Sequence, residues 1–119
     1  MLVDDSEDYR ALLRLALRLD GRFEVVGEAS SGEAALRDVA EAEPDLVVLD
    51  LLMPGMDGLE VHRLLRERVP GVGVAFLSGF PSAAAAGASE LPASLYVNKS
   101  MPVDELLDAL AQLAANKAA

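Results

Sequence analysis

The sequence predicts an α/β fold in which helices cover both faces of one five-stranded parallel sheet. Two observations carry this prediction. Short apolar runs alternate five times with stretches whose apolar residues recur at helical spacing. The run at residues 46–49 is apolar throughout and ends at Asp50, a pattern typical of a strand buried on both faces. Such a chain is expected to form a doubly wound sheet with strand order 2-1-3-4-5 and right-handed crossovers.

The amino-terminal half supplies the first two strands. The first is expected at residues 1–3, directly before an acid pair, and Ser6 is placed to cap the helix that follows. That helix carries a broad apolar stripe and ends at Gly21. The members of the stripe are Leu12, Leu13, Ala16, Leu17 and Leu19. The run FEVVG predicts a second strand at residues 23–27, and a helix is expected over residues 33–42.

The carboxyl-terminal half continues the alternation. The expected elements are strands at residues 46–49, 72–77 and 95–97 and helices at residues 59–69 and 103–115. The Ala-rich segment at residues 83–86 permits only a short, weakly held helix, because Gly87 and Pro92 follow it. His62, in the middle of the helix at 59–69, is expected to be exposed and uninvolved in function.

Composition bounds the classes of function. At 119 residues the chain is expected to form a single domain, residues 1–119. Its net charge of −10 disfavours nucleic acid or an anionic membrane as a direct partner. The absence of cysteine excludes disulfides, zinc thiolates and thiol catalysis. No apolar run has the length of a membrane span and no signal peptide is visible, so we expect a cytoplasmic protein.

Polar residues follow four of the five predicted strands. They are Asp4 with Asp5, then Asp50, Ser78 and Lys99. Because the carboxyl ends of parallel strands share one edge of a sheet, these side chains are expected to converge. Three carboxylates in one cleft repel each other and either raise a pKa or recruit a cation. Oxygen ligands without Cys or His suit Mg²⁺, or alternatively Mn²⁺.

The same residues suit phosphoryl transfer. An oxygen of Asp50 could attack phosphorus while the divalent ion neutralises the equatorial oxygens. Lys99 could hold another phosphoryl oxygen, and the hydroxyl of Ser78 could donate a hydrogen bond to the third. Asp50 is therefore predicted to be a nucleophile that accepts a phosphoryl group.

At this point the sequence resembles a known family, the receiver domains of two-component response regulators. The resemblance rests on the run D-x-x-M-P-G-M-D-G at residues 50–58, on the ordered polar strand ends, and on Tyr96, three residues before Lys99. It covers nearly the whole chain and is nearest to receivers of LuxR-type regulators. The resemblance implies the flavodoxin-like receiver fold, with no output domain within residues 1–119.

The resemblance also implies roles at the acidic edge. Asp50 would be the phosphoacceptor, Asp5 would bind Mg²⁺ directly, and Asp4 would bind it mainly through water. The backbone carbonyl of Leu52 would be a further ligand. The phosphoryl donor would be a phosphohistidine on a sensor histidine kinase or a histidine phosphotransfer protein. The protein would catalyse its own phosphorylation and dephosphorylation without being a conventional enzyme.

The resemblance also implies that phosphorylation changes the conformation of the domain. Lys99 would pair with the phosphoryl group, or with Asp50 when that residue is unmodified. Ser78 would move toward the phosphoryl group, and Tyr96 would turn into the space it leaves. The local charge would thereby change the surface of the last two strands and helices.

Two apolar residues near the site indicate that a phosphoryl group on Asp50 would be long-lived. Leu52 and Phe80 each lie two residues beyond a site residue and would hinder an attacking water, so spontaneous dephosphorylation should be slow. Leu52 also argues against a phosphatase with an aspartyl nucleophile, because such enzymes, which resemble haloacid dehalogenases, need a second acid two residues after the nucleophile as general acid.

A second class of function stays open, namely a receiver fold that acts as an interaction module without phosphorylation. The short first strand and the thin segment after Ser78 favour it, whereas the intact acids and Lys99 argue against it. Homodimerisation is also left open. Where many receivers have a proline after the lysine, this chain has Ser100, so the Lys99–Ser100 bond is predicted to be trans.

Overall fold

The computed structural model describes residues 1–51, 53, 55, 57–79 and 94–118. Its elements are β1 (Leu2–Val3), α1 (Glu7–Asp20), β2 (Glu28–Ala29), α2 (Gly32–Ala42), β3 (Leu46–Asp50), α3 (Gly58–Arg68), β4 (Gly73–Ser78), β5 (Ser94–Asn98) and α5 (Val103–Ala118). Most of these bounds lie close to the predicted ones. The weak helix expected at residues 83–86 lies outside the described residues.

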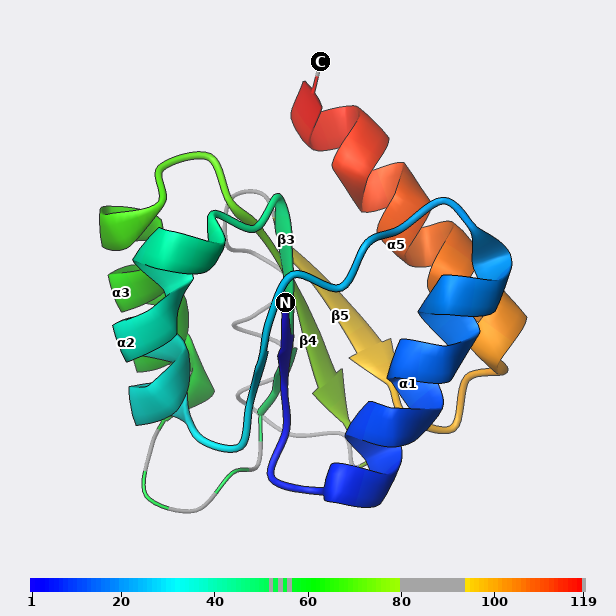
Figure 1. Cartoon of the computed structure of the whole chain (residues 1–119), viewed down its shortest axis with the longest axis horizontal. Helices are drawn as coiled ribbons and strands as arrows, with labels where there is room; N and C mark the ends of the chain where they lie inside the picture. The colour runs from blue at the N-terminus through cyan, green and yellow to red at the C-terminus, as the bar shows by residue number, and fades with distance from the viewer. Residues whose placement is uncertain (52, 54, 56, 80–93, 119) are drawn as a thin grey trace.

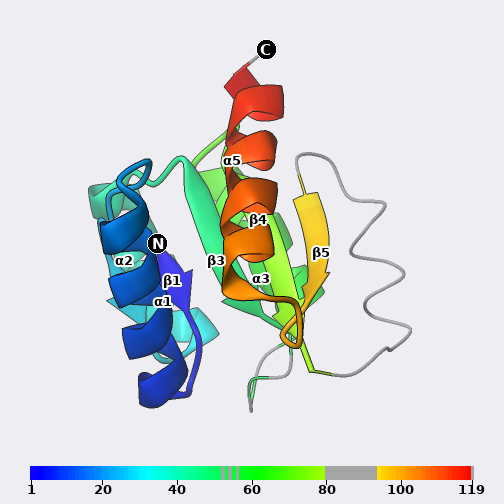
Figure 2. The same ribbon diagram turned by 90° about the vertical axis from the view of Figure 1, so that its right-hand side faces the viewer.

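The five strands form one parallel sheet in the order β2-β1-β3-β4-β5, which confirms the predicted topology. Helices α2 and α3 cover one face, and α1 and α5 cover the other (Figure 1). Figure 2, viewed from the side of α1 and α5, shows α5 in front of the sheet, running roughly along the strands. Among the described residues no peptide bond is cis, so the Lys99–Ser100 bond is trans as predicted.

The core has one layer on each face of the sheet. Strand β3 shows how the sequence divides between them, because successive side chains of a strand point to opposite faces. Val47 and Leu49 pack with α2 and α3, whereas Val48 packs with α1 and α5. All six residues of β4 are buried, as expected for a strand covered on both faces. Within the described part of the chain, no helix has the length and apolar character to cross a membrane.

The prediction of a strand at residues 23–27 is wrong. The second strand consists of Glu28 and Ala29, which pair with Leu2 and Val3 of β1. Strand β1 has only these two residues, so of the FEVVG segment only the Gly27 carbonyl bonds to it, accepting from the Leu2 amide at 3.0 Å, and the residues before Gly27 lie beyond the beginning of β1 (Figure 1). A strand pattern without a partner strand cannot form a hydrogen-bonded ladder.

The prediction that His62 is exposed is also wrong. Its exposed fraction is 4 %, and its ring centroid lies 5.5 Å from that of Phe76 on β4. Val61 and Leu65 are both buried on α3, and His62 lies on the same side of the helix. Its burial places an aromatic pair between α3 and the sheet.

Helix α1 begins as predicted, because the hydroxyl of Ser6 accepts a hydrogen bond from the Tyr9 amide at 3.2 Å. Its apolar stripe is only partly buried. Leu13 and Leu17 are buried, whereas Leu12 is 49 % exposed and Leu19 78 % exposed. The helix therefore packs on the sheet through a face narrower than the sequence indicates.

The terminal amine of Met1 should make the free energy of unfolding depend on pH. It donates a hydrogen bond to the carbonyl of Leu46 at 2.9 Å. Burial lowers the pKa of this amine from 8.0 to about 6, although Asp45 opposes the change. The unfolded chain then binds more protons between pH 6 and 8, so the free energy of unfolding should rise by about 2 kcal/mol across that range.

Denaturant titrations of the chain beginning at Met1, repeated from pH 6 to pH 8, measure this rise. An Nα-acetylated sample is the control, because it has no amine to titrate. Equal pH slopes for the two samples would show that the amine is not responsible.

Candidate functional site

The polar residues predicted to converge lie at the carboxyl edge of the sheet, the lower edge in Figure 1. Asp4 directly follows β1, Asp50 and Ser78 are the last residues of β3 and β4, and Lys99 follows β5. Asp4, Asp50 and Ser78 are buried. Asp5 is exposed, so one carboxylate of the group faces solvent.

Three carboxylates form the centre of the site. Oxygens of Asp4, Asp5 and Asp50 all lie within 4.8 Å of one another. Ligand oxygens around Mg²⁺ lie at about 2.0–2.1 Å from the ion, so opposite ligands are separated by roughly 4.2 Å. The group is therefore only slightly wider than an octahedral magnesium site. The exposed side of Asp5 leaves room for the waters that Mg²⁺ retains.

Lys99 is the counter-ion of these acids. Its ammonium lies 2.9 Å from Oδ2 of Asp4 and 3.4 Å from Oδ2 of Asp50. Burial alone would lower the pKa of Lys99, but the hydrogen bond to Asp4 and the charges of both carboxylates outweigh it and raise the pKa. Lys99 therefore stays charged, and three carboxylates with one ammonium leave a formal charge of −2 for a cation to neutralise.

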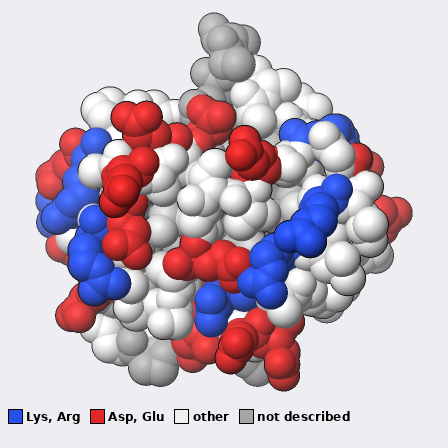
Figure 3. Space-filling model, in the orientation of Figure 1, with Lys and Arg blue, Asp and Glu red and all other residues white. Residues whose placement is uncertain are grey.

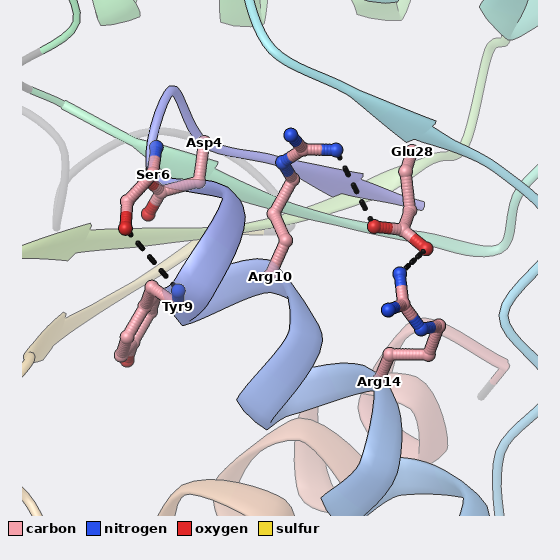
Figure 4. A network of polar contacts seen from close by, with 6 residues as sticks. All are labelled: Asp4, Ser6, Tyr9, Arg10, Arg14 and Glu28. Carbon is pink, nitrogen blue, oxygen red and sulfur yellow. Dashed lines mark hydrogen bonds and ion pairs between the residues drawn. The ribbon is translucent and has the colours of Figure 1, made fainter.

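The turn after β1 fixes the orientation of Asp4. The amide of Ser6 donates a hydrogen bond to Oδ1 of Asp4 at 2.8 Å, and the Ser6 hydroxyl caps α1 (Figure 4). Because Oδ1 is occupied by this bond, Oδ2 is the oxygen that meets Lys99. Ser6 thus both caps α1 and orients the carboxylate of Asp4.

Tyr9 also lies at the site, although the sequence pattern did not predict it. The ammonium of Lys99 lies 4.5 Å from the centroid of the Tyr9 ring, within the range of a cation–π interaction. Burial raises the pKa of Tyr9, while the charge of Lys99 acts in the opposite direction. A signal was present, because Tyr9 lies in the first turn of α1, four residues after Asp5.

A second polar network holds α1 against the sheet. Arg10 and Arg14, one turn apart on α1, contact the two carboxylate oxygens of Glu28 in β2 (Figure 4). The Arg14 contact is 2.6 Å long and the Arg10 contact 3.4 Å. These ion pairs join the helix that carries Tyr9 to the sheet that carries Asp4.

Ser78 and Tyr96 lie on adjacent strands. Ser78 is completely buried, and its carbonyl accepts a hydrogen bond from the Lys99 amide at 2.9 Å. Tyr96 is half-buried, pairs in register with Phe76 and packs against the core. The proposed ligand Leu52 and the proposed shield Phe80 lie outside the described residues, so slow dephosphorylation stays a prediction.

Comparison with known sequences gives the family. The family described as the response regulator receiver domain matches residues 1–111. The nitrate/nitrite response regulator NarL of Escherichia coli is 36 % identical over 118 residues, which cover 98 % of this chain and 55 % of that protein. A protein-glutamate methylesterase/protein-glutamine glutaminase of Myxococcus xanthus is 44 % identical over 83 % of the chain, but only 29 % of that protein is covered. The chain thus spans from about a fifth to about half of the curated relatives it matches.

Solved structures agree. The signal receiver domain of a response regulator NarL from Mycobacterium tuberculosis superposes with a TM-score of 0.83 at 32 % identity. The superposition covers 96 % of this chain and 93 % of that one. A CheY-like receiver domain from Methanospirillum hungatei shares the fold, with a TM-score of 0.87 at 20 % identity over 98 % of this chain and 92 % of that one. The fold, the acidic edge and the sequence match agree, and the chain belongs to the receiver domains of two-component response regulators.

Proposed function

We propose that Asp50 accepts a phosphoryl group from a phosphohistidine on a sensor histidine kinase or a histidine phosphotransfer protein. Receiver domains are phosphorylated on an aspartate in two-component systems. The observation that supports Asp50 is its place at the end of central strand β3, within the acid group and in contact with Lys99. Asp5 is exposed, and one oxygen of buried Asp4 already accepts a hydrogen bond from the Ser6 amide while the other meets Lys99, so Asp50 is the buried carboxylate with fewer such bonds among the described contacts of the two.

The transfer proceeds by direct displacement. An oxygen of Asp50 attacks the phosphorus, the P–N bond of the phosphohistidine breaks, and its electron pair returns to the imidazole. The product is an acyl phosphate on Asp50. Lys99, already beside Asp50, pairs with a phosphoryl oxygen, and the Ser78 hydroxyl donates a hydrogen bond to another.

Mg²⁺ fits the donor set. Asp4, Asp5 and Asp50 would hold the ion, with the backbone carbonyl of Leu52 as a further proposed ligand. A divalent cation there supplies positive charge that neutralises the phosphoryl oxygens. Lys99 must release Oδ2 of Asp4 if that oxygen is to turn toward the ion, because the ammonium now occupies it.

The signal leaves the site through β4 and β5. The added charge draws Ser78 toward the phosphoryl group, and half-buried Tyr96 on the neighbouring strand turns inward. The altered surface of β5 and its flanking segments is what a downstream partner would recognise by population shift.

Incubation with acetyl phosphate and Mg²⁺ tests this function. Intact-mass spectrometry should show the gain of one phosphoryl group, and excess EDTA should abolish the gain because the acids then lack their cation. The same substitution at Asp57 is a matched control for loss of the acid at Asp50. Asp57→Asn removes an exposed acid outside the site but preserves a residue able to cap α3, so this variant should gain the same mass as the parent. Failure of the parent protein to gain mass would favour the phosphorylation-independent interaction module.

Tyr9 is expected to assist by positioning Lys99. In Tyr9→Leu the cation–π contact is lost, and the phosphorylation rate should fall about fivefold, which corresponds to roughly 1 kcal/mol. Tyr9→Phe retains an aromatic face and should react at nearly the parental rate. Rates from acetyl phosphate, followed by mass spectrometry, check this; equal rates for the Leu and Phe variants would remove Tyr9 from the site.

A further inference from the structure

The outer face of α1 carries three exposed leucines. Leu12, Leu15 and Leu19 are 49 %, 53 % and 78 % exposed, and only one other large apolar side chain in the described part of the chain, Val26, is classed as exposed. We call these three residues the leucine stripe. In Figure 3 basic side chains form a band over α1, and uncharged surface lies directly beside it. Apolar side chains gathered on a protein surface mark an interaction site.

The leucine stripe has the spacing of a helix-packing seam. Leu15 follows Leu12 by three residues and Leu19 follows Leu15 by four, the alternation of the apolar positions in a coiled coil. The three side chains therefore lie in one line along α1. The opposite face of the helix already packs on the sheet through Leu13 and Leu17. Helix α1 thus has a second apolar face, with the pattern that fits another helix.

The charges of α1 permit a second copy of this chain to approach. The whole chain has a net charge of −10, so two copies repel each other through most of their surfaces. Helix α1 is an exception, because its sequence contains three arginines and three acids. Two α1 helices can therefore meet without net repulsion between them.

The charges that flank the leucine stripe also have opposite signs at the two ends of α1. Asp8 lies in the first turn and Arg18 in the last. The other two arginines of α1 contact Glu28. In contrast, neither Asp8 nor Arg18 forms an ion pair with any described residue. Both charges are available to a partner helix that runs in the opposite direction.

We propose that a second copy of this chain packs on the leucine stripe, with the two α1 helices antiparallel and a two-fold axis beside Leu15. Such an interface is self-complementary and closes as a dimer. Arg18 of one copy lies opposite Leu12 of the other, one helical turn from its Asp8. The separation of Asp8 and Arg18 along the axis is about 6 Å, which an arginine side chain spans. A parallel pair would instead place like charges together.

Sedimentation equilibrium of the full chain tests the proposal. A pair of 14-residue helices is a small interface beside the roughly 1,200–2,000 Å² of stable complexes, so association should be weak. The measurement therefore extends to about 1 mM protein, at low salt and without Mg²⁺ or acetyl phosphate. The parent chain should form dimers in this range and no larger species.

Two matched variants locate the interface. Leu15→Glu places two carboxylates at the two-fold axis, so the dissociation constant should rise about tenfold or more. Val26→Glu adds the same charge at an apolar residue that is 43 % exposed but lies outside the leucine stripe. It should leave the dissociation constant within about twofold of the parent value. Both residues are exposed, so neither change removes a buried contact.

An exchange of charges tests the antiparallel arrangement. Asp8→Lys and Arg18→Glu should each weaken the dimer, because each leaves two like charges near each other across the interface. Both changes in one chain rebuild every contact with the signs reversed, so the double variant should recover most of the lost association. Circular dichroism of each variant checks that α1 is retained.

Three results would overturn the proposal. The first is a parent chain that stays monomeric at the highest concentration, which would assign the leucine stripe to a helix of another protein. The second is an equal loss of association in Leu15→Glu and Val26→Glu. The third is a double charge variant that associates no better than the single ones. No readout involves phosphorylation, so the outcome is independent of the function proposed for Asp50.

Discussion

Replacing Asp50 with asparagine should abolish phosphoryl acceptance and leave a protein at least as stable as the parent. Asparagine has nearly the same shape as aspartate but offers no carboxylate to attack phosphorus. It also removes one of three carboxylates whose oxygens lie within 4.8 Å of each other, so like-charge repulsion in the site decreases. The 2.9 Å bond between Lys99 and Asp4 does not involve Asp50 and should persist in the variant.

Two measurements separate these effects. Mass spectrometry after incubation with acetyl phosphate and Mg²⁺ should show no gain for Asp50→Asn, and thermal unfolding without Mg²⁺ should show a midpoint at or above that of the parent. A variant that still gains one phosphoryl group would place the acceptor elsewhere. A clearly lowered midpoint would mean that Asp50 stabilises the fold rather than opposing it.

Replacing Lys99 with methionine should have opposite effects on phosphorylation and on metal binding. If the ammonium stabilises charge on the phosphoryl group as proposed, the phosphorylation rate at saturating Mg²⁺ should fall about 100-fold or more. The same ammonium competes with a cation for Asp4 and Asp50, from which it lies 2.9 and 3.4 Å. Its removal should therefore tighten Mg²⁺ binding by about tenfold.

The free energy of unfolding should reflect the same competition between Lys99 and Mg²⁺ for the carboxylates. Without Mg²⁺ the Lys99→Met variant leaves the acids without a counter-ion and should lose about 2 kcal/mol, which added Mg²⁺ restores. Arg63→Met is a suitable control because Arg63 pairs with Glu60 and Glu67 on the exposed side of α3, where ion pairs contribute little. Isothermal titration with Mg²⁺ and denaturant melts provide both readouts; weaker Mg²⁺ binding in Lys99→Met would contradict the competition.

The grouping of polar residues at the carboxyl edge of the sheet could be predicted from the sequence, because it depends only on the topology of the strands. Once the strands are parallel, the residues that follow them must meet, and the structure brings Asp4, Asp5, Asp50 and Lys99 together as expected. The buried run before Asp50 identified the central strand without reference to any distant contact. These predictions needed only the local pattern and the direction of the chain.

The wrong or missing predictions, at residues 23–27, His62 and Tyr9, have a common cause. Each depends on a residue or strand that is distant in the sequence, and the local pattern does not reveal it. FEVVG has the pattern of a strand, but a strand needs a neighbouring strand to pair with. Strand β1 is too short to lie beside this segment. His62 reads as polar, but Phe76 provides a surface that buries its ring. Tyr9 reads as an ordinary helix residue, and only the approach of Lys99 across the sheet places it in the site.

The most direct test of Asp50 as the phosphoacceptor locates the phosphoryl group in the sequence. After reaction with acetyl phosphate and Mg²⁺, borohydride reduction converts an acyl phosphate on aspartate to homoserine, and peptide mapping then locates it. The structure predicts homoserine at position 50, at the end of β3, with Asp4 and Asp5 unchanged. Homoserine at another acid, or at none in a sample that has gained a phosphoryl group, would contradict it.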